Sequence, residues 1–292
     1  MKTLLVLGRH GQVARELAKL TPPAGWRLTF RGRDDLDLAA SPDFAGLLAE
    51  TGAAVVINAA AHTAVDKAET DQDLAYALNR DAPAALALAC AKAGVPLVHF
   101  STDYVFDGAK DGPYLETDPK NPVSFYGRSK SQGEDAILAS GARCAILRTS
   151  WVYAASGSNF VRTMLRLARE RDEVRVIGDQ LGRPTWAKDC AEVAILAAMK
   201  LADGGNLGVL HIAGGGDATW AQFADAIFAW LEEHGEKRPE LAVITTAEYP
   251  TAAHRPANSR LDTTKIEQVL GWQARPWRYS LAACLDEIER GE

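Results

Sequence analysis

A tyrosine and a lysine four residues apart carry the strongest chemical signal of this chain: Tyr126 and Lys130 in the segment YGRSK. On a helix these two positions share one face, so the phenol and the ammonium would project together. A free tyrosine has a pKa of about 10, and a neighbouring cation stabilises the phenolate and lowers that value. The pair is therefore a candidate proton donor to a carbonyl oxygen, although Tyr–Lys pairs without a chemical role are also common on helices.

A second polar group follows the apolar run at residues 96–101. Thr102, Asp103 and Tyr104 stand side by side in HFSTDYVFDG, directly after a stretch typical of a buried strand. In open α/β sheets the carboxyl ends of the strands line the ligand crevice. These three side chains are therefore expected at the reactive edge of a sheet.

A glycine turn follows the first apolar run. Gly8, Gly11 and Ala14 have the spacing G-x-x-G-x-x-A, a variant of the dinucleotide fingerprint. Gly8 permits the tight turn, Gly11 lets the backbone approach a pyrophosphate, and Ala14 allows close packing of helix on strand. Glycines at strand ends often serve the turn alone, but at the first strand of an alternating α/β chain this spacing favours a nucleotide.

The end of the second apolar run bears on the choice of cofactor. An acidic residue there is typical of NAD sites, whereas this chain has Arg31 and Arg33, which suit a 2′-phosphate. NADPH is therefore favoured and NADH is left open, as is the alternative that both arginines are merely solvated. Asp37 and Leu38 are candidates for contact with the adenine, and residues 58–63 follow the third strand.

The surrounding elements predict an α/β fold. Apolar runs of strand length at 3–7, 27–30, 53–60, 96–101 and 144–150 alternate with helical stretches, of which 73–94 ends at Gly94 and is started or bent by Pro83. This alternation predicts a Rossmann-type, doubly wound parallel sheet over residues 1–150, completed by about 187–215. Residues 151–292 are expected to form mainly a smaller α/β substrate domain, with strands at 174–178 and 208–214 and a helix beginning with a capping pattern at Thr219.

Composition excludes several classes of protein. The chain has 292 residues, 47% of them hydrophobic and 24% charged, and a net charge of −6, which gives no basic surface for nucleic acid or an anionic membrane. The apolar start is shorter than a signal-peptide core, and no apolar run approaches the roughly 20 residues of a membrane helix. Four widely spaced cysteines are expected to be reduced thiols of a cytoplasmic protein.

Taken together, these motifs resemble the extended short-chain dehydrogenase/reductase family. Within it, the chain is similar to the reductases that act on dTDP-4-dehydro-β-L-rhamnose. The resemblance spans nearly the whole chain and includes GRHGQVA, NAAAHTAVDKAE (58–69), STDYVFDG, YGRSK, RTSWVY (148–153), NFVRTMLRLA (159–168), DQLGRPT (179–185) and RPANSRLD (255–262).

The resemblance implies reduction of the C4 ketone by NAD(P)H to give dTDP-L-rhamnose. Tyr126 would donate the proton, Lys130 would lower its pKa and bind the nicotinamide ribose, and Thr102 would hydrogen-bond the reacting oxygen. The cofactor site would comprise Gly8, His10, Gly11, Gln12, Val13, Arg31, Arg33, Asp37, Leu38, Ala60, Ala61, His62, Thr63, Tyr126 and Lys130. The sugar nucleotide would contact Thr102, Asp103, Tyr104 and Trp151, with Arg255 a candidate for its diphosphate.

Departures and rivals remain open at this point. Some relatives bind Mg²⁺ at a dimer interface, but only Glu16 stands at such a position here and Lys188 lies near where a second acid is expected. No metal is therefore predicted, and a homodimer is left open. The rivals are another sugar-nucleotide reductase, epimerase or dehydratase, or a non-catalytic nucleotide-binding subunit. Dehydratases have Asp-Glu after the threonine, whereas here Tyr104 follows Asp103, which favours simple reduction.

Overall fold

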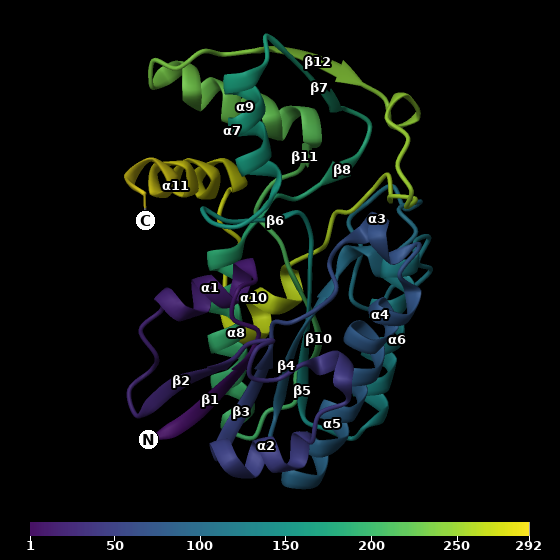
Figure 1. Ribbon diagram of the computed structural model, residues 1–292, viewed down its shortest axis with the longest axis vertical. Coiled ribbons are helices and arrows are strands. Elements are labelled where there is room, and N and C mark those ends of the chain that lie inside the picture. Colours follow the sequence, from purple (N-terminus) through teal and green to yellow (C-terminus); the bar gives the residue numbers. More distant parts are fainter. Residues whose placement is uncertain (292) are drawn as a thin grey trace.

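A parallel sheet of six strands forms the centre of the molecule, in the order β10-β5-β4-β3-β1-β2 (Figure 1). The computed structural model describes residues 1–291. All neighbouring strands of this sheet run parallel, so the Rossmann-type fold predicted from the alternating runs is confirmed. Its strands are β1 (Lys2–Leu7), β2 (Trp26–Arg31), β3 (Ala53–Asn58), β4 (Leu97–Thr102), β5 (Cys144–Thr149) and β10 (Gly208–Ile212).

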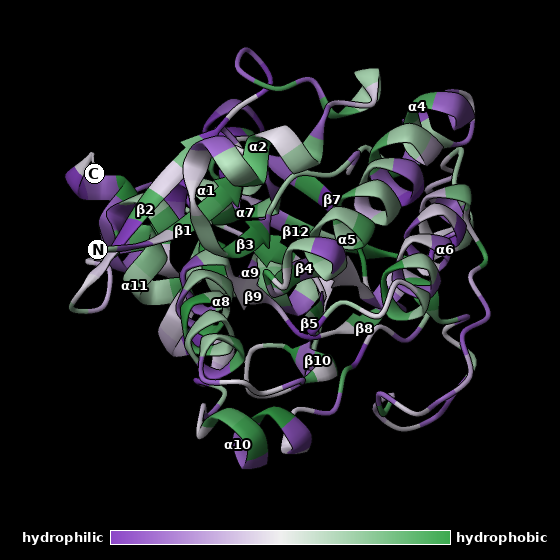
Figure 2. Ribbon diagram, turned by 90° about the horizontal axis from the view of Figure 1, so that it is seen from below, coloured by the Kyte–Doolittle hydropathy of each residue, from purple (hydrophilic) through white to green (hydrophobic). Residues whose placement is uncertain are grey.

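Helices cover both faces of the sheet. Because side chains alternate along a strand, Leu4 and Val6 of β1 face the cluster under α1 and α8, whereas Leu5 and Leu7 face the cluster under α2, α5 and α6. The strands β3 and β4 are hydrophobic between these layers (Figure 2). The helices are α1 (Gln12–Lys19), α2 (Phe44–Thr51), α5 (Ala82–Ala93), α6 (Phe125–Ala139) and α8 (Ala187–Ala202).

The single helix expected over 73–94 is found as one continuous helical run over 72–93, which consists of α4 (Gln72–Tyr76), a π-helical stretch, η2 (Ala77–Asp81), and α5. The short helix α3 (Val65–Ala68) precedes this run. Pro83 lies inside this run, just after η2, where its missing N–H can make no helical hydrogen bond. Gly94 ends α5 with a left-handed backbone, as predicted. Asn79 lies in the widened turn η2, and its side chain contacts residues near the site described below.

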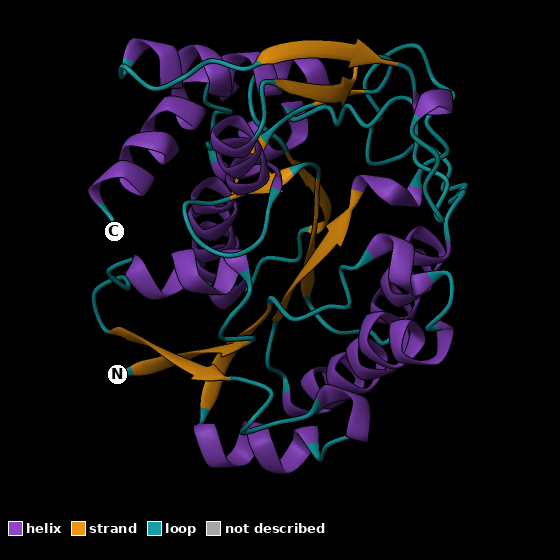
Figure 3. Ribbon diagram, turned by 45° about the horizontal axis from the view of Figure 1, so that its top comes forward, coloured by secondary structure: helices purple, strands orange, loops and turns teal. Residues whose placement is uncertain are grey.

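Most of the second half of the chain packs beside one end of the sheet (Figures 1 and 3). Residues 187–215 instead contribute α8 and β10 to the central layers. The Thr219 hydroxyl accepts from the Gln222 N–H in a capping box, as its sequence pattern predicts. The helix α10 (Thr264–Leu270) packs against α8 and β10. The elements outside the central layers are β6 (Val152–Tyr153), α7 (Phe160–Glu170), β7 (Glu173–Ile177), β8 (Leu181–Gly182), β9 (Thr185–Trp186), β11 (Ala218–Thr219), α9 (Trp220–Glu233), β12 (Glu240–Ile244) and α11 (Trp277–Arg290).

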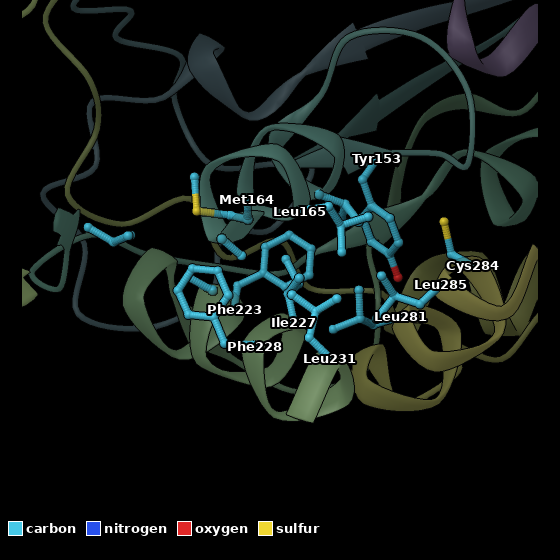
Figure 4. Packing of buried hydrophobic residues seen from close by; sticks show 14 of the residues in the cluster. Tyr153, Met164, Leu165, Phe223, Ile227, Phe228, Leu231, Leu281, Cys284 and Leu285 are labelled. Carbon is cyan, nitrogen blue, oxygen red and sulfur yellow. The ribbon is translucent and has the colours of Figure 1, made fainter. Parts of the chain in front are cut away.

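An aromatic core joins α7, α9 and α11. Phe223 is fully buried and contacts Tyr153, Phe160 and Trp277 at ring-centroid distances of 5.3 to 5.7 Å. Figure 4 shows Phe223 among aliphatic side chains, including Leu281 from α11. This second core is separate from the two clusters that flank the sheet. Of the described helices, none combines the length and apolar character needed to cross a membrane.

Candidate active site

The carboxyl ends of the strands open into a cavity of about 670 Å³. The short helix η3 (Asp103–Val105) and the start of α6 form one wall, and the turn after β1 forms another. The sequence-predicted residues that line this cavity are Gly8, His10, Gly11, Gln12, Val13, Arg33, Ala60, Ala61, Thr63, Thr102, Asp103, Tyr104, Tyr126, Lys130 and Trp151.

A smaller cavity of about 240 Å³ continues from the first. The two share Gly8, Arg33, Ala60 and Ala61 as lining residues. Arg31, Asp37 and Leu38 line only the smaller one. A long groove with glycine-turn backbone at its middle fits an extended dinucleotide, with the adenine end at the smaller cavity.

The turn after β1 approaches the chain after β3 closely. Gly8 has a φ of +110°, and an added Cβ would lie 3.3 Å from the backbone of Ala59 and Ala60. Only glycine combines that backbone with that approach at no steric cost. Gly11 then precedes α1 without any side-chain cap on the helix N-terminus. The first N–H groups of α1 therefore remain available for a phosphate.

The arginines after β2 occupy different settings. Arg31 pairs with Glu50 at 2.8 Å. The Arg33 side chain is 80% exposed, and its nearest carboxylate is that of Asp37, at 3.8 Å. Asp37 itself caps the short helix η1 (Leu38–Ala40) by accepting the Ala39 N–H. Arg33 is the freer of the two cations at the groove.

The helix α6 begins at a tightly fixed point. Ser124 accepts the Gly127 N–H at 3.1 Å, and an added Cβ on Gly127 would lie 2.1 Å from the Tyr104 carbonyl oxygen. The close approach of α6 to η3 therefore requires glycine at 127. It brings the Tyr104 and Tyr126 rings edge to face, 5.5 Å apart, in the wall of the cavity.

The electrostatics of Tyr126 differ from the sequence expectation. Burial raises the pKa of the Tyr126 phenol, outweighing the lowering effect of its hydrogen bond with Thr102. The Lys130 nitrogen does not supply the expected compensation, since it donates to the Phe100 carbonyl at 2.6 Å and lies 3.2 Å from His99 Nε2. Burial lowers the pKa of Lys130 itself to about 8. Burial thus shifts both the phenol and the amine towards their neutral forms.

Thr102 and Asp103 form a directed pair. The Thr102 hydroxyl donates to Asp103 Oδ1 at 2.9 Å and accepts the Tyr104 N–H at 3.2 Å. Burial raises the pKa of Asp103 to about 6, against hydrogen bonds from Ser259 and Thr102 that lower it. In this arrangement the proton of the Thr102 hydroxyl is directed at Asp103.

Trp151 connects the end of β5 to the second half of the chain. It has a φ of +48°, a conformation unusual for a bulky residue. Its indole stacks on Trp220 of α9 at 3.6 Å, and an added Cβ on Gly182 would lie 2.3 Å from that indole. Trp151 is thereby fixed from two sides as it lines the cavity.

Three sequence candidates lie outside both cavities. His62 is buried, and Asn79 of η2 accepts its N–H and donates to its carbonyl. Arg255 forms a two-point ion pair with Asp66 at 2.7 and 3.0 Å. Glu16 is buried beside Lys19 at 3.0 Å.

The surroundings of Glu16 do not resemble a metal site. Lys19 bridges Glu16 to Glu287 of α11. Among residues 1–291, no three His, Cys, Asp or Glu side chains are grouped so that they could hold a metal ion. The cation beside Glu16 in this structure is the ammonium of Lys19.

Sequence reasoning missed the buried polar residues behind the cavity. Asn58 and His99 contact each other at 3.1 Å, and Asn79 donates to Ser129 Oγ at 3.0 Å. A signal was present, because an asparagine and a histidine interrupt strands that are otherwise apolar, and buried polar groups need partners.

Comparison with known proteins assigns the family. The sequence pattern of the family described as RmlD substrate binding domain matches residues 1–290. A dTDP-4-dehydrorhamnose reductase of Sinorhizobium fredii is 44% identical over 280 residues, covering 95% of this chain and 94% of the relative. A protein of the same name from Escherichia coli is 39% identical, with 98% and 97% covered.

Solved structures agree over the full length. The dTDP-4-dehydrorhamnose reductase of Clostridium acetobutylicum superimposes with a TM-score of 0.91 at 36% identity, covering 98% of this chain and 99% of that one. The dTDP-4-dehydrorhamnose reductase of Bacillus anthracis, solved in complex with NADP, gives 0.90 at 31% identity, with 98% and 100% covered.

Proposed function

The chain belongs to the RmlD substrate binding domain family and is an oxidoreductase, and from this premise we propose that it reduces the C4 ketone of dTDP-4-dehydro-β-L-rhamnose to dTDP-L-rhamnose. One observation carries the proposal. The cavity that contains the glycine turn also contains Thr102, Tyr126 and Lys130, so a nicotinamide site and a proton donor share one space. The relatives' shared name supplies the substrate.

In this reaction a bound nicotinamide cofactor would supply the hydride to C4. The Tyr126 hydroxyl gives its proton to the developing alkoxide, which avoids leaving a charge on the product oxygen. The contact between Thr102 and the phenol oxygen helps to fix the position of Tyr126, while the single phenol proton is left for the substrate oxygen. Lys130 assists when it is protonated, because a cation beside the phenol makes the phenolate less costly.

NADPH is the cofactor favoured by the groove. Among residues 1–291, Arg33 has no carboxylate within ordinary hydrogen-bond range, and it lines both cavities. A guanidinium can bind a 2′-phosphate through two N–H groups. The Bacillus anthracis relative was solved with NADP. Arg31, held by Glu50, is the weaker candidate for this contact.

The sugar nucleotide would lie between the sheet and the second half of the chain. Asp103 and Tyr104 border the cavity from η3, and Trp151 borders it from the end of β5. Residues 151–292 would supply most of the substrate side. Arg255 would have to leave Asp66 to bind a diphosphate, so its expected role stays a prediction. The expectations of a cytoplasmic protein and of a homodimer also stay predictions.

Two rivals receive less support. A dehydratase needs a base after the threonine–aspartate pair, and burial instead raises the pKa of the Tyr104 phenol that stands there. A non-catalytic nucleotide-binding subunit has no need of a buried proton donor, yet Tyr126 is buried beside Thr102 in the cavity.

The test is turnover by the purified protein. With NADPH and authentic 4-keto sugar nucleotide, we expect nicotinamide absorbance to fall and dTDP-L-rhamnose to form. Tyr126→Phe should lower kcat by about 10³-fold while NADPH still binds, because the fold keeps its ring and loses the proton donor. Tyr279→Phe, the same change on an exposed tyrosine, is the matched control. Absence of turnover by the wild-type protein would refute the proposed reaction.

A further inference from the structure

A buried polar chain runs from β3 through β4 to α6, behind the cavity. Asn58 Nδ2 lies 3.1 Å from His99 Nδ1, and His99 Nε2 lies 3.2 Å from Lys130 Nζ. Asn58 and Lys130 are each 2% exposed and His99 is 0% exposed. Every hydrogen in this network of hydrogen bonds must therefore come from one of these three side chains or from the backbone beside them.

The backbone fixes which way the chain of hydrogen bonds runs. The Ala60 N–H donates to Asn58 Oδ1 at 3.1 Å. An N–H donor requires an oxygen opposite it, so the amide nitrogen of Asn58 must face His99. Asn58 Nδ2 can only donate hydrogen bonds. His99 Nδ1 is consequently an acceptor without a proton.

The remaining proton of His99 then faces Lys130. Burial holds the pKa of His99 well below its usual range, so the ring is neutral. A neutral imidazole has one N–H, which must be on Nε2 because Nδ1 accepts. An ammonium has no lone pair to receive that hydrogen, whereas a neutral amine has one. Lys130 Nζ can accept from His99 and still donate to Phe100 O at 2.6 Å.

We propose that Asn58 and His99 are positioning residues that favour the neutral amine of Lys130 in the cofactor-free protein and thereby lower the pH below which it carries charge. The inference deepens the proposed function, on which it rests, since the charge of Lys130 acts on Tyr126. Reduction then depends on the protonation of Lys130, which the facing Nε2–H of His99 opposes. Turnover should accordingly decline as the pH rises through the titration of Lys130.

The other charged groups near Lys130 do not remove this preference for the neutral amine. Glu134, on the same helix, favours the ammonium. Its carboxylate is held by two bonds from Arg148 of β5, at 2.7 and 2.9 Å, and lies 3.4 Å from Lys120. From η3, Asp103 acts on Tyr126. Burial still lowers the pKa of Lys130 to about 8 despite Glu134.

The first experiment reads the protons directly in cofactor-free protein. Histidine ¹⁵N resonances distinguish a protonated Nε2 from a protonated Nδ1, and loss of one signal set in His99→Gln assigns His99. We expect the Nε2–H form. In protein labelled at lysine ¹³Cε, with Lys130→Met for assignment, the Lys130 signal should titrate with a midpoint below about 8, since burial and a facing donor both oppose the charge.

The second experiment uses Asn58→Asp to reverse the direction of these hydrogen bonds. Its two carboxylate oxygens would accept from the Ala60 N–H and from a proton on His99 Nδ1, leaving Nε2 free to accept from an ammonium. We expect His99 to change tautomer and the Lys130 midpoint to rise by about one pH unit or more. His99→Phe removes the facing donor without adding charge and should raise the midpoint too, provided thermal unfolding shows that it is folded.

In turnover, Asn58→Asp should move the alkaline decline of kcat upward by the same shift. A purely structural role would lower kcat at every pH and leave the midpoint in place. The inference is overturned if wild-type His99 is protonated on Nδ1, or if the Lys130 midpoint stays unchanged in Asn58→Asp. Because the resonance measurements need no turnover, a protein that failed to reduce the sugar would refute the proposed function and leave this inference standing.

Discussion

Both halves of the molecule have apolar cores, but they differ in the buried polar contacts near the cavity. Behind the cavity, buried polar side chains meet in pairs, such as Asn58 with His99 and Arg148 with Glu134. The core around Phe223 in the second half is built from aromatic and aliphatic side chains (Figure 4). Hydrogen bonds fix direction as well as distance, whereas apolar packing chiefly fixes volume. The difference suggests that proton positions are set in the sheet half and cavity shape in the other.

The halves meet at Trp151. Its indole stacks on Trp220 of α9, while its backbone follows β5 directly. A change in the apolar core can therefore reach the cavity through one aromatic contact. The following variants test how far the two kinds of contact act independently.

The largest expected effect comes from breaking the buried ion pair of the sheet half. Arg148→Leu leaves Glu134, fully buried, without its two principal donors. We expect the free energy of unfolding to fall by about 4 kcal/mol in urea titrations. The double variant Arg148→Leu/Glu134→Leu should recover most of that loss, because no unpaired charge remains. Arg166→Leu, at an exposed pair, is the control and should cost below about 0.5 kcal/mol.

The apolar half is tested by Phe223→Ala. Removing this fully buried ring should lower the free energy of unfolding by about 3 kcal/mol, and Phe223→Leu by about 1 kcal/mol, because the smaller cavity loses fewer contacts. NADPH affinity, measured by fluorescence titration, should stay within about twofold of wild type. A loss of cofactor affinity in step with stability would contradict the division between the halves.

Asp103→Asn tests the cost of a buried charge in the sheet half. Folding raises the pKa of Asp103 from 3.8 to about 6, mainly through burial. The contribution of Asp103 to the free energy of unfolding is thus complete below about pH 4 and is lost as the pH rises through 6. At pH 8 the variant should unfold with about 2 kcal/mol more free energy than wild type, and near pH 3.5 with no difference. An advantage of equal size at both pH values would argue against this origin.

The smallest effect is expected at the rim of the groove. Arg33→Ser should weaken NADPH binding about fivefold and leave NADH binding unchanged, since an exposed guanidinium contributes modestly to phosphate binding. Titration of both cofactors gives the comparison, with Arg166→Ser as an exposed control. Equal losses for the two cofactors would show that Arg33 does not contact a 2′-phosphate.

Much of the fold and part of the site could be predicted from local patterns. The apolar runs are found as strands, and the Thr219 capping box forms as its spacing predicts. The cavity brings together Thr102 and Tyr126, which are separated along the chain. The expected Tyr126–Lys130 electrostatics did not follow, because i,i+4 spacing places two side chains on one face and says nothing of a third group that binds one of them.

The sequence by itself determined the alternation of strands and helices, the glycine turn, and which side chains stand at the strand ends, since these depend on local periodicity and backbone preference. Only the tertiary structure decided what those side chains do to one another. The amide direction of Asn58 depends on the Ala60 N–H, and the Lys130 nitrogen is bound from β4. Protonation depends on burial and on neighbours distant in sequence, and both exist only once the chain has folded.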